Sequence, residues 1–160
     1  MKIFSVGFLL LLALTGCSVS FSPEPEADLP KPTTGTTRQQ TEAADAARQY
    51  LALIDSKEYE QTWDRAGSAL KATTNKLMWT GLLKTSSHAL GSPAQREIEG
   101  FGFTSQINAA VPVGDYVMVQ FKSKSGNTTL TEKVVMQKEK GSWKIIGYFA
   151  TKRTEFGAST

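Results

Sequence analysis

The chain has 160 residues, an apolar fraction of 40%, and 18 basic against 15 acidic side chains, which gives a net charge of +3. This length fits one folded domain, because domains usually contain about 100 to 200 residues. Basic and acidic residues alternate at 58–65 and 132–140, so the basic stripe that nucleic-acid binding requires is missing. The single cysteine, Cys17, excludes a disulfide within the chain. We expect one packed core and no nucleic-acid partner.

The first residues have the order of a secretory signal peptide. Lys2 precedes an apolar run at residues 3–14, which is shorter than the roughly 20 residues that cross a bilayer as a helix. Leu-Thr-Gly-Cys at residues 14–17 then resembles the lipobox of bacterial lipoproteins. The resemblance implies a signal peptide at residues 1–16, cleavage before Cys17, and covalent diacylglyceryl and N-acyl lipid on that cysteine. The alternatives are an ordinary signal peptide with a chance cysteine, or a buried core helix.

Residues 17–37 are expected to form the lipidated cysteine and a tether. Four of the six prolines fall in this segment, together with many Ser and Thr residues, so it cannot bury enough apolar surface to fold. Ser18 follows the cysteine, and the analogy with enterobacterial sorting points to the outer membrane. We therefore expect a protein of the cell envelope, anchored by lipid in the outer membrane and facing the periplasm.

Helical spacing begins at about Arg38 and predicts three helices. Apolar residues follow one stripe at residues 43–54, and Thr37 with Gln40 reads as a capping box at its start. A second helix is predicted from Asp55 to about residue 70, with Tyr59, Trp63, Ala66 and Leu70 on one side. A third covers residues 75–90, where an apolar run contains Leu77, Met78, Trp79, Leu82 and Leu83.

After Pro93 the apolar period changes to two and predicts four strands, at about residues 97–108, 116–123, 129–138 and 142–152. Alternation gives each later strand one apolar face, which can receive the helices. The expected fold class is α+β: three N-terminal helices packed on one face of a curved four-stranded antiparallel sheet. The domain is expected at residues 38–153, followed by a flexible tail at residues 154–160.

Several segments together resemble a family of bacterial secreted proteins and lipoproteins called DUF4019. The resemblance rests on residues 50–63, Trp79, residues 90–91, Arg96, residues 114–121, Glu132 and residues 141–149. Its most specific part is the Gly-x-Trp-x-x-x-Gly-Tyr-Phe motif that ends at Phe149. It covers about residues 43–151. It implies a cystatin-like or NTF2-like shape and no established activity.

Few residues suggest catalysis. His88 is the only histidine, so a multi-histidine metal site or a His-Cys pair cannot form within one chain, and its position near a helix end suits a partly exposed structural role. NTF2-like enzymes use a carboxylate, often with a tyrosine, inside the fold. The corresponding residues here are Asp55, Asp64, Glu132, Tyr59 and Tyr116. We interpret Asp55 as a helix cap, Asp64 as facing water, and Glu132 as pointing outward or pairing with a lysine.

Aromatic residues offer the other candidate site. A ligand pocket or partner surface could contain Trp63, Trp79, Trp143, Tyr148 and Phe149, although aromatic residues at core spacing usually belong to the core. Gly147 within a strand suggests a bulge or a close backbone approach.

The expected function is a non-enzymatic binding or interaction module of the envelope, with the membrane and an envelope protein as partners. It has no predicted catalytic or metal-binding residue and no cofactor other than the lipid on Cys17. The alternative is an NTF2-like small-molecule-binding protein or enzyme with a carboxylate in its cone.

Overall fold

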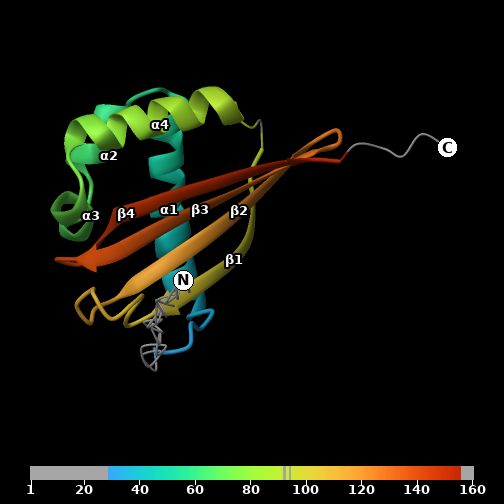
Figure 1. The fold of residues 1–160 in the computed structure, drawn as a ribbon. Coiled ribbons are helices and arrows are strands. Elements are labelled where there is room, and N and C mark those ends of the chain that lie inside the picture. The colour runs from blue at the N-terminus through green and yellow to red at the C-terminus, as the bar shows by residue number, and fades with distance from the viewer. Residues whose placement is uncertain (1–28, 92, 94, 156–160) are drawn as a thin grey trace, which may run out of the picture.

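The computed structural model describes residues 29–91, 93 and 95–155 and has the expected α+β class. Helices come first and strands follow (Figure 1). The elements are α1 (Thr37–Asp55), α2 (Tyr59–Asp64), α3 (Ser68–Thr73), α4 (Lys76–Leu90), β1 (Glu97–Thr104), β2 (Tyr116–Ser125), β3 (Thr128–Glu139) and β4 (Ser142–Thr154). Cys17 and the first part of the expected tether lie outside the described residues. Within the described part of the chain, no helix combines the length and apolarity needed to cross a membrane.

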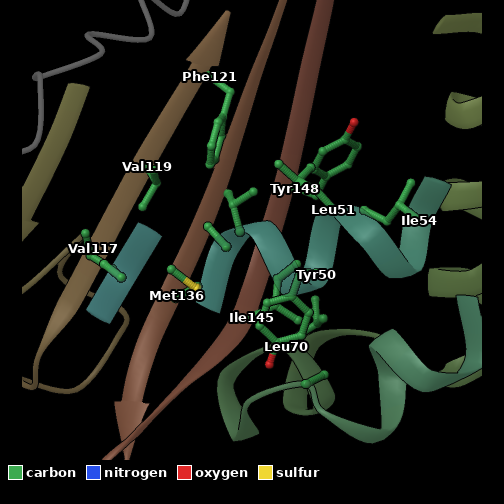
Figure 2. Close-up of a cluster of buried hydrophobic side chains, with 14 of the residues drawn as sticks. Tyr50, Leu51, Ile54, Leu70, Val117, Val119, Phe121, Met136, Ile145 and Tyr148 are labelled. Atoms are coloured by element: carbon green, nitrogen blue, oxygen red, sulfur yellow. The ribbon is translucent and has the colours of Figure 1, made fainter. Parts of the chain in front are cut away.

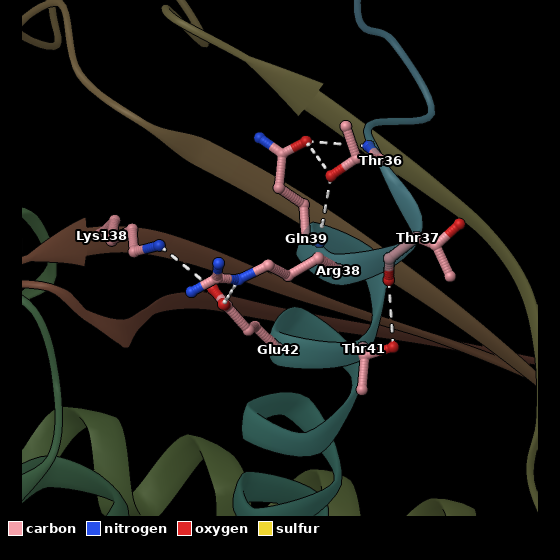
Figure 3. Close-up of polar contacts among 7 residues, drawn as sticks. All are labelled: Thr36, Thr37, Arg38, Gln39, Thr41, Glu42 and Lys138. Atoms are coloured by element: carbon pink, nitrogen blue, oxygen red, sulfur yellow. Dashed lines mark hydrogen bonds and ion pairs between the residues drawn. The ribbon is translucent and has the colours of Figure 1, made fainter.

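Helix α1 begins with a capping box, one residue earlier than predicted (Figure 3). The Thr36 hydroxyl accepts from the Gln39 amide at 3.3 Å, and the Gln39 side chain accepts from the Thr36 amide at 2.8 Å. One turn later, Glu42 binds Arg38 at 3.0 Å and Lys138 of β3 at 3.2 Å. These contacts satisfy amides that a helix start leaves unpaired, and they attach the first turns of α1 to the sheet.

The predicted second helix is divided in two, and its predicted start at Asp55 is wrong. Asp55 is the last residue of α1, and α2 begins after Glu58, whose side chain makes no cap. Between α2 and α3, Ala66 pairs in parallel with Ile145 of β4, and the Gly67 amide donates to the Ile145 carbonyl at 2.8 Å. Helical hydrogen bonds cannot form where the backbone pairs with a strand, so the apolar spacing here continues through a break.

The four strands form an antiparallel meander in the order β1-β2-β3-β4. Strand β1 ends at Thr104, four residues earlier than predicted. Pairing between β3 and β4 shifts next to Gly147, where Val135 pairs with Gly147 but Met136 pairs with Ile145. The intervening Ile146 is therefore an extra residue, and the expected bulge at Gly147 is confirmed.

The core lies between α1 and one face of the sheet. Figure 2 shows Tyr50, Leu51 and Ile54 of α1 facing the strands that carry Val119, Phe121 and Met136. Ala43 and Ala47 are fully buried, and their small side chains allow the helix to approach the sheet closely. Among the described residues, all four helices lie on this inner face, and none lies on the opposite, outer face of the sheet (Figure 1).

Candidate functional site

Four polar side chains meet in the otherwise apolar interface between α1 and the sheet. Arg96, just before β1, lies between Asp55 at the end of α1 and Glu132 in β3. Arg96 Nε and Nη2 donate to the two Glu132 oxygens at 2.6 and 3.1 Å, and Nη1 and Nη2 donate to those of Asp55 at 2.6 and 2.9 Å. The Tyr148 hydroxyl of β4 donates to Glu132 Oε1 at 2.8 Å. We call these four residues the Arg96 cluster.

Strand alternation explains why a carboxylate lies inside the fold. Glu132 shares the inner face of β3 with Val134 and Met136, and its side chain is 2% exposed. Isolated charges are costly to bury, so such a residue requires hydrogen-bonded partners of opposite charge. The interpretation that Glu132 points outward or pairs with a lysine is therefore wrong, because the partner is an arginine from a loop 36 residues away in sequence.

Charge and burial act together on this cluster. Burial alone lowers the pKa of Arg96, but hydrogen bonds to Asp55 and Glu132 outweigh it and raise the pKa. Burial, followed by the negative charge of Glu132, raises the pKa of Tyr148 far above its usual range. Arg96 stays protonated and Tyr148 stays neutral, so the phenol remains a hydrogen-bond donor.

The cluster is suited to holding elements together. Both Glu132 oxygens accept hydrogen bonds from Arg96, and one of them also accepts from Tyr148. A general base needs an oxygen directed at a substrate proton, and these oxygens are directed at other protein groups. The contacts instead join the end of α1 to β1, β3 and β4.

The other acid-base candidates do not join this cluster. The Asp64 side chain is 65% exposed beside Lys76, as predicted. Tyr59 is half-buried against the core. Tyr116 is buried, donates its hydroxyl proton to the Pro112 carbonyl at 2.7 Å, and accepts from Gln137. His88 is exposed in the last turn of α4, as its position predicted.

The five aromatic candidates do not line one pocket. Trp79 and Tyr148 are buried, and the Trp79 indole donates to the buried Thr62 hydroxyl at 2.9 Å. Trp63 and Trp143 are half-buried at the edge of the core. Phe149 is 61% exposed on the outer face of the sheet. Sequence spacing correctly indicated aromatic residues of the core but not which one reaches solvent.

Trp143 does line an open hollow of about 300 Å³ at the start of α1. Phe103 and Tyr116 contribute further aromatic surface there, and Lys138 lies 5.3 Å from the Trp143 ring. Among the described residues, no group of three or more His, Cys, Asp or Glu side chains could hold a metal ion.

An exposed apolar surface on α4 was not distinguished from the core by sequence. Leu77, Met78 and Leu82 are 80%, 65% and 53% exposed, whereas Trp79 and Leu83 are buried. All five belong to one apolar run in the sequence. Helical spacing distinguishes the two groups. Trp79 and Leu83 are four residues apart and share one side of α4, and Met78 and Leu82 share a different side.

The chain matches a known protein family. A family described as "protein of unknown function (DUF4019)" matches residues 46–148, which is more than half of the chain. The chain belongs to the DUF4019 family. The matched part of this DUF4019 protein runs from within α1 into β4 and contains all four residues of the Arg96 cluster. A search of the curated proteins found no match.

Proposed function

We propose that this DUF4019 protein is a non-enzymatic interaction module of the cell envelope that binds a protein partner through the exposed apolar surface of α4. The observation that carries the proposal is the exposure of Leu77, Met78 and Leu82, at 80%, 65% and 53%, on two successive turns of one helix. Grouped exposed apolar side chains, unlike scattered single ones, mark interaction sites on soluble domains.

A groove beside these side chains supports a protein ligand. The groove between α2 and α4 has a volume of about 690 Å³ and is lined by Tyr59, Leu77 and Gly81. A side chain at Gly81 would meet no atom within 4 Å, so a partner can approach the α4 backbone there. The groove also contains Glu58, Glu60 and Lys84, which offer the mixed polar rim of protein interfaces.

The alternative function, small-molecule binding or catalysis with a carboxylate in the cone, has weaker support. Glu132 is already held by Arg96 and Tyr148, and Asp64 is largely exposed. The hollow beside Trp143 is lined by Asp115 and by the candidate Tyr116, but by none of the three predicted carboxylates. We therefore rank the protein-binding function first.

The lipobox-like motif supports attachment of the module to the outer membrane through lipid on Cys17, facing the periplasm. Two or three acyl chains give a stable anchor, whereas one chain binds only reversibly. Mass spectrometry of the protein from membrane extracts should find a mature chain that begins at Cys17 and carries lipid. The Cys17→Ser variant should keep its signal peptide and lose the lipid. A mature chain that begins elsewhere and has no lipid contradicts this part of the proposal.

Site-directed photo-crosslinking in intact cells tests the α4 surface. A photoreactive phenylalanine analogue at Leu82 should give a discrete adduct with a protein. The same analogue at Val113, which is 75% exposed in the loop between β1 and β2, is the matched control. Adding Leu77→Lys should abolish the Leu82 adduct, because a charge enters the apolar surface. Equal adducts at both positions, or an adduct that survives Leu77→Lys, would reject the α4 interface.

A further inference from the structure

The outer face of the sheet carries a group of basic side chains around an exposed aromatic ring. Lys122 and Lys124 of β2, Lys133 of β3 and Arg153 of β4 belong to this group, and Phe149 lies directly opposite Lys133 in the β3–β4 ladder. We call these five residues the basic sheet face. They alternate with inner-face residues such as Phe121 and Val134, which pack under α1.

Pairing brings the basic residues together from three strands. Lys124 and Arg153 both pair with Thr129, so they flank one residue from its two sides. Lys122 pairs with Thr131, one alternation step along the same face of β3. Neighbouring strands lie about 4.8 Å apart, so these charges fall within a few strand widths. The patch combines basic side chains with threonine hydroxyls.

Acidic residues compensate only part of this charge. Glu97 and Glu99 lie on β1 at the margin of the face, and Glu99 binds Lys122 at 2.7 Å. Hydrogen bonds from Lys122 and Gln120, with a contribution from the charge of Lys133, lower the pKa of Glu99. The ion pairs formed within the described residues do not involve Lys124, Lys133 or Arg153. Three basic side chains therefore remain available for an anionic surface.

The N-terminal segment enters the domain beside the same face. Thr33 and Phe103 exchange two backbone hydrogen bonds of 2.8 Å at the outer edge of β1. A side chain at Gly102 would meet Pro32 at 3.6 Å and Met118 at 3.7 Å, and Met118 pairs with Val135 on the outer face. Residues 32 and 33 therefore lie at the β1 edge of the outer face, one alternation step along β2 from Gln120, which pairs with Lys133.

We propose that the basic sheet face lies on an anionic lipid surface, with Phe149 at the level of the lipid headgroups. Lys and Arg side chains are attracted by acidic phospholipids, and Phe is among the apolar side chains that enter the headgroup boundary beside Lys and Arg in proteins that lie on membranes. The basic side chains, with Thr129 and Thr131 between them, suit the hydrated headgroup region better than an apolar protein groove. Because α4 lies on the helical side of the sheet, the inference does not depend on the α4 partner, and both surfaces can be occupied together.

Lysine footprinting on the full chain tests the inference. The protein is reconstituted into vesicles of phosphatidylcholine alone or with one third phosphatidylglycerol, so its N-terminal attachment is common to both. Brief acetylation followed by mass spectrometry then measures the accessibility of each lysine. Lys124 and Lys133 should be acetylated about fivefold less on the anionic vesicles. Each basic residue gains binding free energy from the anionic surface, and contact with lipid shields its amine from the reagent. Lys71 and Lys84, exposed on the helical side, are the internal controls and should not change.

Salt and paired variants separate a charged contact from simple crowding at the vesicle. In 1 M salt the Debye length falls to about 3 Å, so the protection should disappear. The double variant Lys124→Glu with Lys133→Glu should abolish the lipid-dependent protection of Lys122. The variant Lys71→Glu with Lys84→Glu makes the same change in net charge and should keep that protection. Circular dichroism verifies that both variants fold.

Two results would overturn the inference. Equal acetylation of Lys124 and Lys133 on both kinds of vesicle would exclude a contact that depends on anionic lipid. Protection of Lys71 and Lys84 instead would mean that the helical side faces the membrane. Since the α4 crosslinking experiment uses a different surface and readout, either proposal can fail without the other.

Discussion

Arg96 and Glu132 form a two-point ion pair inside the fold, with Nε to Oε2 at 2.6 Å and Nη2 to Oε1 at 3.1 Å. The Glu132 side chain is 2% exposed and that of Arg96 is 14% exposed, so water competes little for either group. Bidentate arginine-carboxylate pairs combine charge with fixed geometry. The pair therefore sets where the loop before β1 meets β3.

The first prediction concerns the loss of this buried carboxylate. Glu132→Gln leaves the Arg96 charge buried with only Asp55 as a partner, and removing one member of a buried pair typically costs about 3 kcal/mol. Urea unfolding should show a correspondingly lower free energy of unfolding. Asp55→Asn is the matched control, because the Asp55 side chain is 31% exposed and solvent can replace part of its interaction. Its expected cost is about 1 kcal/mol.

The order of the two costs tests the structural role of the cluster. If Asp55→Asn destabilised the protein as much as Glu132→Gln, burial would not determine the contribution of each carboxylate. A Glu132→Gln variant with unchanged stability would contradict the view that the ion pair stabilises the fold by joining the loop before β1 to β3.

The second prediction is a loss of stability at alkaline pH that depends on Tyr148. Burial and the charge of Glu132 raise the pKa of Tyr148 in the folded state above the unfolded value of about 10. The folded protein therefore holds the phenol proton more tightly, so its contribution to stability is complete below about pH 10 and is lost progressively as the pH rises above that value. Urea unfolding at about pH 9 and about pH 11 should show this decrease.

Tyr148→Phe supplies the comparison for the alkaline effect. The variant should lose about 1 kcal/mol at neutral pH, because the hydrogen bond to Glu132 is removed. Its further loss between about pH 9 and about pH 11 should be smaller than that of the natural protein. Tyr50, whose pKa burial also raises, keeps part of the effect in both proteins. Identical pH profiles would show that Tyr148 ionises as readily in the fold as in the unfolded chain.

The third prediction compares neighbouring leucines of α4. Leu83 is fully buried, so Leu83→Ala should remove about 2 to 5 kcal/mol from the free energy of unfolding by leaving a cavity. Leu82 is 53% exposed, and Leu82→Ala should change stability by less than about 0.5 kcal/mol. Thermal melts of the two variants measure the difference. A large loss for Leu82→Ala would place this residue in a packed contact and remove the basis of the α4 interface.

Periodicity predicted most of the fold because the apolar pattern and the local geometry agree over long segments. Around Val119 and Val134, the alternation of apolar and polar residues allows only one face of each strand to be buried. The four strands and their antiparallel order agree with this pattern. The break after α2 could not be predicted in this way. It arises because Ala66 and Gly67 pair with Ile145. These segments are almost 80 residues apart, so no local sequence pattern indicates the contact.

The polar cluster was only partly visible for the same reason. Glu132 occupies an inward position of β3 between apolar residues, so strand alternation indicates its burial. Its partner Arg96 lies in a loop, where no periodicity fixes the direction of a side chain. Sequence could therefore indicate a buried charge, but only the assembled fold identifies the arginine that compensates it.

The last prediction separates backbone strain from steric overlap at two glycines. Gly35 and Gly141 both have a positive φ, +72° and +80°, so an alanine at either position costs about 1 kcal/mol through backbone conformation. At Gly35 the added methyl group would also lie 2.5 Å from the Phe103 ring, whereas at Gly141 it would meet no atom within 4 Å. Gly35→Ala should therefore cost about 1 to 3 kcal/mol more than Gly141→Ala in urea unfolding, because the buried ring must move. Gly35 precedes α1, beside the contact between Thr33 and Phe103, so the comparison measures how firmly the segment before α1 is packed on β1. Equal costs would mean that this segment moves aside without loss, and the position of residues 32 and 33 on β1 would then not be fixed by packing.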